Sequence, residues 1–348
     1  MMEKQALLGK TRAELQQVAS GLGLPAYTAS QLADWIYKKH VQDFSEMTNL
    51  AKRARELLTE KYVVGSIRYT RVDVSEDGTK KYLFPSGGHN FIEAAWIPEE
   101  KRNTLCLSSQ AGCKMGCLFC MTGKQGFQAN LSPGEIVNQL WSLPEREQVS
   151  NLVFMGMGEP FDNMDNLMKS LDILTASWGM AISPRRITVS TIGIIPAISR
   201  FIDESECHLA VSLHSPFEEE RQKIMPIENV YPLPEILALL KSYDFPRQRR
   251  ISFEYIMFKD FNDSKRHINE LVRLMHGLKA RINLIRFHPV PGTPLQGSDD
   301  PTIHEFKDAL NAKGVNTTIR ASRGLDIAAA CGLLSTKELL RKEQEKDY

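Results

Sequence analysis

Short apolar runs of strand length alternate with longer amphipathic segments over most of the chain. The apolar runs lie at residues 105–109, 152–155, 187–190, 209–213, 251–257, 282–287 and 315–320. Segments with helical periodicity lie between them, at residues 132–143, 163–177, 195–204, 233–243, 265–276 and 302–312. Repetition of strand and helix requires a parallel sheet, and about six repeats predict an α/β fold with a barrel or partial barrel.

Two smaller regions precede this repeat. Residues 1–66 have helical patterns, with capping boxes that begin at Thr11 and Thr28. Residues 67–98 alternate apolar and polar positions around two turn signals, Asp77-Gly78 and Gly87-Gly88, and predict an antiparallel hairpin unit. We therefore expect a helical accessory domain at 1–66, a hairpin linker at 67–98, a barrel at 99–335 and a charged tail at 336–348.

The composition is that of an ordinary folded chain. Its 348 residues are 42% apolar and 24% charged, which excludes global disorder and a small disulfide-stapled fold. Lys and Arg number 43 against 42 Asp and Glu, so any contact with nucleic acid must come from local patches. Seven arginines are candidates for phosphate contact, and the alternative is that they are scattered surface residues. They are Arg185, Arg186, Arg247, Arg249, Arg250, Arg320 and Arg323.

Neither a signal peptide nor a membrane span is expected. The first residues, MMEKQALLGK, lack an apolar core, and no stretch approaches the roughly 20 apolar residues of a spanning helix. We expect a cytoplasmic protein without membrane contact. Thiols are reduced in the cytoplasm, so the six cysteines are first interpreted as metal ligands, catalysts or core residues. Cys207, which has no cysteine nearby in the sequence, is expected in the core.

The unusual short motifs fall at the carboxyl ends of the predicted strands, where parallel barrels form their active sites. They are the cysteine loop after the first strand, then Gly156-Met-Gly-Glu-Pro160, Ser190-Thr-Ile-Gly193, Ser212-Leu-His214 and Phe287-His-Pro289. A single pocket is predicted.

The spacing of Cys113, Cys117 and Cys120 is the most specific signal in the chain. Three thiolates on one short loop can bind three irons of a [4Fe–4S] cluster and leave the fourth iron open to an outside ligand. The alternatives are structural zinc, which needs a fourth protein ligand, and core packing. The spacing resembles that of radical S-adenosylmethionine (SAM) enzymes, in which the open iron binds the methionine part of SAM.

Gly158 and Glu159 follow the second predicted strand. Glycine allows close approach of the backbone to a ligand, and a carboxylate accepts a hydrogen bond from an ammonium group. A plain strand-to-helix turn is the alternative. Beside the cysteine loop, the segment resembles the one that holds the amino group of SAM in radical SAM proteins.

The stretch from Phe91 to Leu333 resembles a narrower family, the RlmN/Cfr family of radical SAM RNA methyltransferases. The matching segments include Leu105-Cys-Leu-Ser-Ser-Gln110, Phe154-Met-Gly-Met-Gly-Glu159, Ser183-Pro-Arg-Arg186, Met225-Pro-Ile227, Ile282-Asn-Leu-Ile-Arg286 and Asp326-Ile-Ala-Ala-Ala-Cys-Gly332. The resemblance implies a partial (βα)6 radical SAM barrel that uses a [4Fe–4S] cluster and SAM, with the helical start as an RNA-docking domain.

The resemblance also implies how a methyl group can reach an unreactive carbon of adenine. Carbon 2 of adenine is not nucleophilic, whereas a cysteine thiolate is. In the family, one SAM methylates the cysteine that matches Cys331, and a radical from a second SAM removes hydrogen from that methyl group. The carbon radical adds to adenine, a base matching Glu93 takes the ring proton, and the thiol matching Cys106 releases the product through a transient Cys106–Cys331 disulfide. Without the family resemblance, Cys331 is most simply a small buried apolar residue, Cys106 one position in a strand, and Glu93 an outward-facing strand residue.

Further family positions contact SAM. The matching residues here are Ser190, Ser212, Leu213 and His214, together with His288, which replaces an asparagine usual in the family. The alternative for each of these residues is that its side chain contacts only neighbouring protein groups and no ligand.

Two methylation positions compete. Residues 212–216 and 190–196 are closer to the adenine-C8 enzymes of the family, whereas residues 123–127, 253–257 and 289–292 are closer to the C2 enzymes, and we favour C2. The implied substrates are an adenosine in the peptidyl-transferase loop of 23S rRNA and the adenosine 3′ to the anticodon of tRNA, both accessible loop bases. A monomer reduced by flavodoxin or ferredoxin is expected. The alternative that is not an enzyme is an RNA-binding module stabilised by zinc.

Overall fold

The computed structural model of the chain describes residues 4–245 and 249–336. Seven strands run parallel in one sheet, in sequence order: β6 (Arg102–Cys106), β9 (Asn151–Phe154), β10 (Ile187–Thr191), β11 (His208–Ser212), β12 (Ile251–Met257), β13 (Ala280–Arg286) and β14 (Thr317–Ile319). Over the described residues β14 remains an edge strand, so the barrel is open and the prediction of a partial barrel is confirmed.

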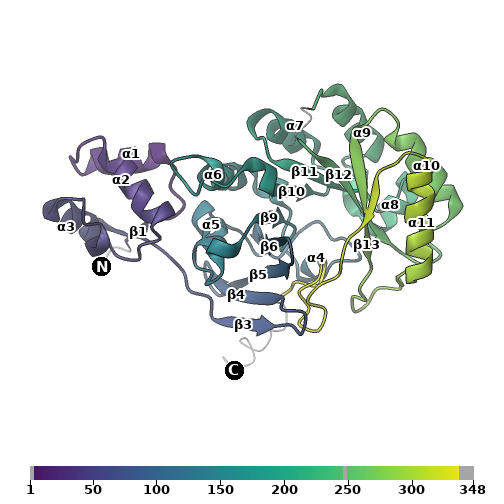
Figure 1. Cartoon of the computed structure of the whole chain (residues 1–348), viewed down its shortest axis with the longest axis horizontal. Helices are drawn as coiled ribbons and strands as arrows, with labels where there is room; N and C mark the ends of the chain where they lie inside the picture. The colour runs from purple at the N-terminus through teal and green to yellow at the C-terminus, as the bar shows by residue number, and fades with distance from the viewer. Residues whose placement is uncertain (1–3, 246–248, 337–348) are drawn as a thin grey trace.

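Helices connect these strands and cover the outside of the sheet (Figure 1). The crossovers contain α5 (Pro133–Trp141), α6 (Met164–Thr175), α7 (Ile195–Glu204), α9 (Leu233–Ser242), α10 (Lys265–Met275) and α11 (Asp300–Ala312). Their apolar faces pack on strands that are themselves largely buried, as the uninterrupted buried run of β12 illustrates. This gives the six predicted βα units in the described part of the chain. The sequence patterns did not predict α8 (Glu218–Ile224) or the short α4 (Met121–Gln125).

The predicted hairpins extend the same sheet. β3 (Arg71–Val74), β4 (Lys80–Ser86) and β5 (Asn90–Glu99) pair antiparallel, and β5 pairs with β6. The ten-stranded order is therefore β14-β13-β12-β11-β10-β9-β6-β5-β4-β3. Because the hairpin unit is hydrogen-bonded to the barrel, side chains on β4 and β5 lie next to the first barrel strand.

The N-terminal helices are α1 (Arg12–Gly21), α2 (Thr28–Ala33), which continues into a π-helical turn (Asp34–Lys38), and α3 (Lys52–Lys61). They form a separate group at one end of the molecule (Figure 1). The group packs on α5 and α6, where Trp141 donates a hydrogen bond to the carbonyl of Ile36 (2.7 Å) and Lys169 pairs with Glu14 (2.7 Å). A short parallel pair, β1 (Gln5–Ala6) and β2 (Tyr62–Val63), closes it.

Two local expectations are wrong. The capping box at Thr11 forms, but Thr28 is already inside its helix, which begins after a helical Tyr27 and has no side-chain cap. The first barrel strand ends at Cys106, three residues before the expected end, because its pairing with β5 and β9 stops there. The chain then forms a small two-stranded sheet, β7 (Gln110–Ala111) with β8 (Ala129–Asn130), around the cysteine loop.

Cys207 is buried in the core, as predicted. Among the described helices, none has the length and apolar character needed to cross a bilayer. The four-part division of the chain stays a prediction, and its tail, apart from Thr336, lies outside the described residues.

Candidate active site

The three clustered cysteines lie on the loop between β7 and α4, at the carboxyl end of the barrel sheet. Cys113 is buried and its amide donates to the carbonyl of Gly126 (3.2 Å). Cys117 and Cys120 are partly buried against apolar side chains that include Ile192 and Met225. The loop is thus held between the small β7–β8 sheet and the loops that follow β10 and β11.

The chemistry of these donors fits an iron–sulfur cluster. Burial raises the pKa of Cys113 to about 12 and that of Cys117 strongly, and the charges of the neighbouring thiolates act in the same direction. Bound iron would stabilise thiolates at such positions. Among the described residues, no three His, Cys, Asp or Glu side chains converge on a single ion. In a [4Fe–4S] cluster each thiolate binds a different iron, so three thiols on one loop match a cluster, whereas structural zinc needs a fourth protein ligand.

Gly158 and Glu159 lie in the loop after β9. Gly158 has φ +96°, and a Cβ there would lie 2.5 Å from the Cβ of Gln110, so only glycine allows the close approach to β7. The buried Glu159 carboxylate accepts hydrogen bonds from the Thr191 hydroxyl (2.6 Å) and from the amides of Ile192 (2.9 Å) and Phe161. Burial raises the Glu159 pKa to about 7, and these hydrogen bonds oppose the rise. Glu159 therefore connects the loops after β9 and β10.

Ser190 and Ser212 lie at the carboxyl ends of β10 and β11, and Leu213 follows directly. A fully buried arginine from α8, Arg221, holds these ends together. It donates to the carbonyls of Ile192 (2.9 Å), Ser212 (3.1 Å) and Leu213 (3.2 Å). The predicted SAM-contacting segments of two strands are thus fixed relative to each other by one side chain.

His214 and His288 occupy different surroundings. His214 is buried with φ +55°, its Nδ1 accepts from the amide of Ile256 (3.0 Å), and its ring meets Phe119 of the cysteine loop edge-on with centroids 4.7 Å apart. Burial lowers the His214 pKa to about 3, so the ring is neutral. His288 follows β13, contacts the hydroxyl of Ser322 at 3.0 Å and has a pKa lowered by burial.

Cys106 and Cys331, far apart in the sequence, line the same cavity of about 490 Å³, together with His288. Both are free thiols. Burial raises the Cys106 pKa to about 12, and the charge of Cys331 acts in the same direction. Arg320 lines this cavity too, and its pKa is raised chiefly by Cys331. The guanidinium of Arg320 therefore lies close to Cys331.

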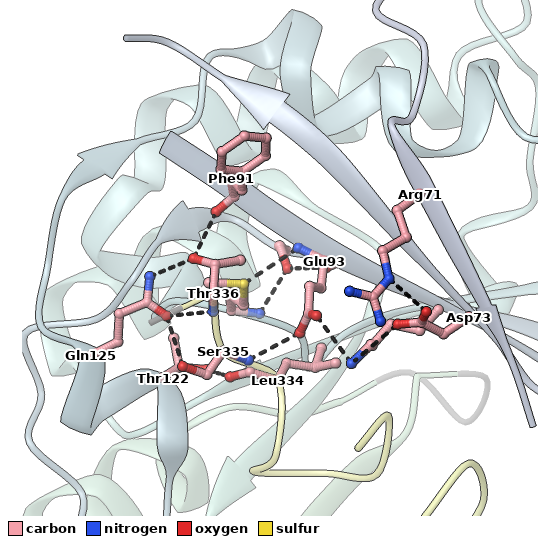
Figure 2. Close-up of polar contacts among 12 residues, drawn as sticks. Arg71, Asp73, Phe91, Glu93, Thr122, Gln125, Leu334, Ser335 and Thr336 are labelled. Carbon is pink, nitrogen blue, oxygen red and sulfur yellow. Dashed lines mark hydrogen bonds and ion pairs between the residues drawn. The ribbon is translucent and has the colours of Figure 1, made fainter. Parts of the chain in front are cut away.

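Glu93 lies on β5, on the same face as Ala95, which pairs with Cys106 across the two strands. One carboxylate oxygen is 3.1 Å from the ammonium of Lys81, and the other accepts from the amide of Ser335 (3.0 Å). Burial raises the Glu93 pKa, and Lys81 opposes the rise. Glu93 is not among the residues that line the cavity of the two thiols, and Ser335, in the segment after Cys331, lies beside it (Figure 2).

The segment from Leu334 to Thr336 is attached to α4 and β5 by side-chain and backbone hydrogen bonds (Figure 2). Thr122 donates to the carbonyl of Leu334 (2.6 Å), Gln125 accepts from the hydroxyl of Ser335 (3.0 Å) and the amide of Thr336 (2.9 Å), and Thr336 donates to the carbonyl of Phe91. The chain just before Cys331 is attached as well. Asp326 accepts from Ser75 (2.5 Å), and the amide of Gly324 donates to Asp77 (2.9 Å).

Lys81 and Arg221 were not predicted from the sequence. The register of the hairpin around Gly87-Gly88 could have indicated Lys81, because it places Lys81 opposite Ala95 and on the same face of the sheet as Glu93. For Arg221 the sequence gives no signal, because its partners are backbone carbonyls from distant loops. Of the arginines considered for phosphate contact, Arg249 donates to the carbonyls of Phe201 and Ile202, and Arg247 lies outside the described residues.

Two family models match the chain. The radical SAM superfamily matches residues 107–274, and the ribosomal RNA large subunit methyltransferase N-terminal domain matches residues 5–64. The first covers the cysteine loop and most barrel strands, and the second covers the N-terminal helical group.

Curated proteins and a crystal structure resemble nearly the whole chain. A probable dual-specificity RNA methyltransferase RlmN of Parabacteroides distasonis is 56% identical over 97% of this chain and 98% of its own length. The dual-specificity RNA methyltransferase RlmN of Nitratiruptor sp. is 41% identical over 95% of this chain and 98% of its own length. A radical SAM methyltransferase from Sphaerobacter thermophilus superposes with a TM-score of 0.89 at 38% identity, over 95% of this chain and 99% of that one.

Proposed function

The chain belongs to the RlmN family of radical SAM RNA methyltransferases, and from this premise we propose that it methylates carbon 2 of adenine in two RNAs. The substrates are an adenine in the peptidyl-transferase loop of 23S rRNA and the adenine 3′ to the anticodon of tRNA. Curated relatives carry the description "dual-specificity". The observation that carries the proposal is that Cys106 and Cys331 line one cavity, with Glu93 on the adjacent strand.

Cys113, Cys117 and Cys120 would bind three irons of a [4Fe–4S] cluster. The fourth iron would bind SAM, whose other contacts would come from Gly158, Glu159, Ser190, Ser212, Leu213, His214 and His288. When bound, the cluster and SAM supply methyl groups and a hydrogen-abstracting radical. All Glu159 oxygens already have protein donors, so any contact with the SAM amino group would use a remaining lone pair.

Cys331 would carry the methyl group to adenine. Its thiolate is nucleophilic where carbon 2 of adenine is not, and the guanidinium of Arg320 lines the same cavity. Glu93 would accept the ring proton, and the unpaired electron that radical addition leaves on the ring would return to the cluster, which supplied one electron for the cleavage of SAM. The Cys106 sulfur would then attack the Cys331 sulfur, so that an S–S bond forms, the S–C bond to the product breaks, and the C–S electron pair leaves with the methylated ring and is protonated there.

The lining of the thiol cavity supports an RNA substrate. It contains six arginines against two carboxylates, although the whole chain is nearly balanced in charge. The arginines are Arg102, Arg185, Arg250, Arg281, Arg320 and Arg323, and the carboxylates are Glu99 and Glu254. Such a local excess of guanidinium groups suits phosphates of a bound strand. A flavodoxin or ferredoxin as reductant, a monomeric enzyme and a cytoplasmic location belong to the same proposal.

The test is to map methyl groups by mass spectrometry on 23S rRNA and tRNA from cells with and without this protein. We expect 2-methyladenosine at both sites only when the protein is present. A methyl group on carbon 8 would replace the C2 assignment, and unmethylated RNA would refute the activity. Iron analysis of anaerobically purified protein separates the remaining alternative, because a zinc-stabilised binding module would contain zinc and no iron.

A further inference from the structure

Four charged side chains of alternating sign lie in a row across β3, β4 and β5, and Figure 2 labels three of them, Arg71, Asp73 and Glu93. Arg71 donates to Asp73 (2.7 Å), Asp73 is 3.9 Å from the ammonium of Lys81, and Lys81 is 3.1 Å from Glu93. The exposed fraction of the side chain falls along the row, from 58% at Arg71 to 23% at Asp73, 12% at Lys81 and 6% at Glu93. The last ion pair is therefore little screened by solvent.

The strand register produces this row. Asp73 pairs with Lys81 across β3 and β4, and Lys81 pairs with Ala95 across β4 and β5. Glu93 precedes Ala95 by two residues, so it shares the face of Lys81 and lies within diagonal reach of a long side chain. The next lysine, Lys80, points to the opposite face and pairs there with Glu145.

A nearly buried lysine is retained only with good partners. Lys81 has two carboxylates, Asp73 and Glu93, at its ammonium group. The groups that act on Glu93 come from three elements: Lys81 from β4, Asp73 from β3, and the amide of Ser335 from the C-terminal segment. Lys81 and the amide of Ser335 favour the carboxylate, Lys81 more strongly, whereas burial and the charge of Asp73 favour the neutral acid.

We propose that Lys81 is a positioning residue that keeps Glu93 deprotonated and orients it to accept a proton, with Asp73 holding Lys81 in place. This rests on the proposed role of Glu93 as the base. In that step the ring C–H bond breaks, its electron pair stays in the ring, and an O–H bond forms on Glu93. Lys81 still pairs with Asp73 when Glu93 becomes neutral, so the step leaves no cation unpaired in the interior.

The experiment follows a covalent protein–RNA adduct during single turnover of the anaerobically reconstituted protein, between pH 5.5 and 9. The adduct and its conversion to methylated RNA are measured on denaturing gels, and 5′-deoxyadenosine is measured separately because it forms before Glu93 acts. Lys81→Met removes the charge and Lys81→Arg keeps it. Lys80→Met is the matched control on the opposite face of the strand. Glu93→Gln gives the rate of adduct conversion in the absence of the base.

The rate of adduct conversion should fall at low pH, where Glu93 becomes protonated, and this fall is called the acid limb of the pH–rate profile. We expect the acid limb to lie at the same pH for wild-type protein, Lys80→Met and Lys81→Arg. For Lys81→Met the limb should move to higher pH by about 1 to 3 units, the usual effect of losing an opposite charge at this distance. Conversion below the limb should then slow at least about tenfold, with 5′-deoxyadenosine unchanged. If Lys81→Met does not fold, Lys81→Gln, which lacks the charge but can still donate to Glu93, is measured instead.

An unmoved acid limb in a folded, uncharged variant overturns the role of Lys81. Failure of the proposed function gives a different result, because the wild-type protein itself then makes neither adduct nor methylated RNA.

Discussion

The buried ion pair between Arg221 and Glu228 provides a quantitative prediction. Both side chains are almost completely inaccessible, and they form a direct salt bridge. The second oxygen of Glu228 accepts from the amide of Leu233 (2.8 Å). In Glu228→Gln the amide cannot neutralise the guanidinium, and one of the two donors loses its acceptor.

Removing one partner of a buried ion pair typically destabilises a protein by about 3–5 kcal/mol, because a buried charge remains uncompensated. A shift of roughly 2–4 °C per kcal/mol, typical of somewhat smaller proteins, gives a fall of about 10 °C in apparent melting temperature. Since Arg221 also donates to the carbonyls of Ser212 and Leu213, we expect weaker SAM binding at temperatures where the variant is folded.

The assay is thermal unfolding of anaerobically purified protein, followed by circular dichroism, with equilibrium dialysis of SAM at 15 °C. Glu219→Gln, an exposed position on the helix that carries Arg221, is the matched control. A Glu228→Gln protein that melts within about 2 °C of this control would refute the reasoning that Glu228 compensates a buried charge.

Other substitutions test individual parts of the site. Cys106→Ala should accumulate a covalent protein–RNA adduct through Cys331, seen as a slower band on denaturing gels; normal turnover without adduct would exclude a resolving role for Cys106. Gly158→Ala places a Cβ 2.5 Å from that of Gln110 at φ +96°, so SAM binding should fall at least about tenfold, and unchanged dialysis would contradict the packing argument. His214 has a folded-state pKa of about 3, below its unfolded value of about 6.5. Its contribution to stability is therefore present above pH 6.5 and is lost as the pH falls, about 2 kcal/mol between pH 7 and 5. A smaller pH dependence in His214→Gln is expected in urea titrations, and an identical one would show that His214 does not cause the loss.

Periodicity predicted the barrel well because its strands are buried on both sides and its helices on one. β12 and α7 have the bounds that the sequence predicted. Elements whose limits depend on partners were less predictable. The end of β6 is set by the neighbouring strands, and β7 and β8 exist because the cysteine loop brings two short segments together.

For the candidate site, motifs indicated the loops but not how they are held. The positions of Cys106 and Cys331 in one cavity follow from tertiary packing and were expected only from the family resemblance. Arg221 and Lys81 are ordinary charged residues in the sequence. Their roles depend on burial and on partners from other elements, which local patterns do not report.

The attachment of the chain on both sides of Cys331 limits the volume that its sulfur can explore. Leu334 lies only three positions after Cys331, and its carbonyl accepts a hydrogen bond from Thr122. At roughly 3.5 Å per residue the thiol therefore moves within about 10 Å of that anchor. Such tethering gives Cys331 a high effective concentration at Cys106. In the proposed reaction an intramolecular disulfide would therefore outcompete capture of Cys331 by free cellular thiols, and its reduction would become an obligatory part of every catalytic cycle.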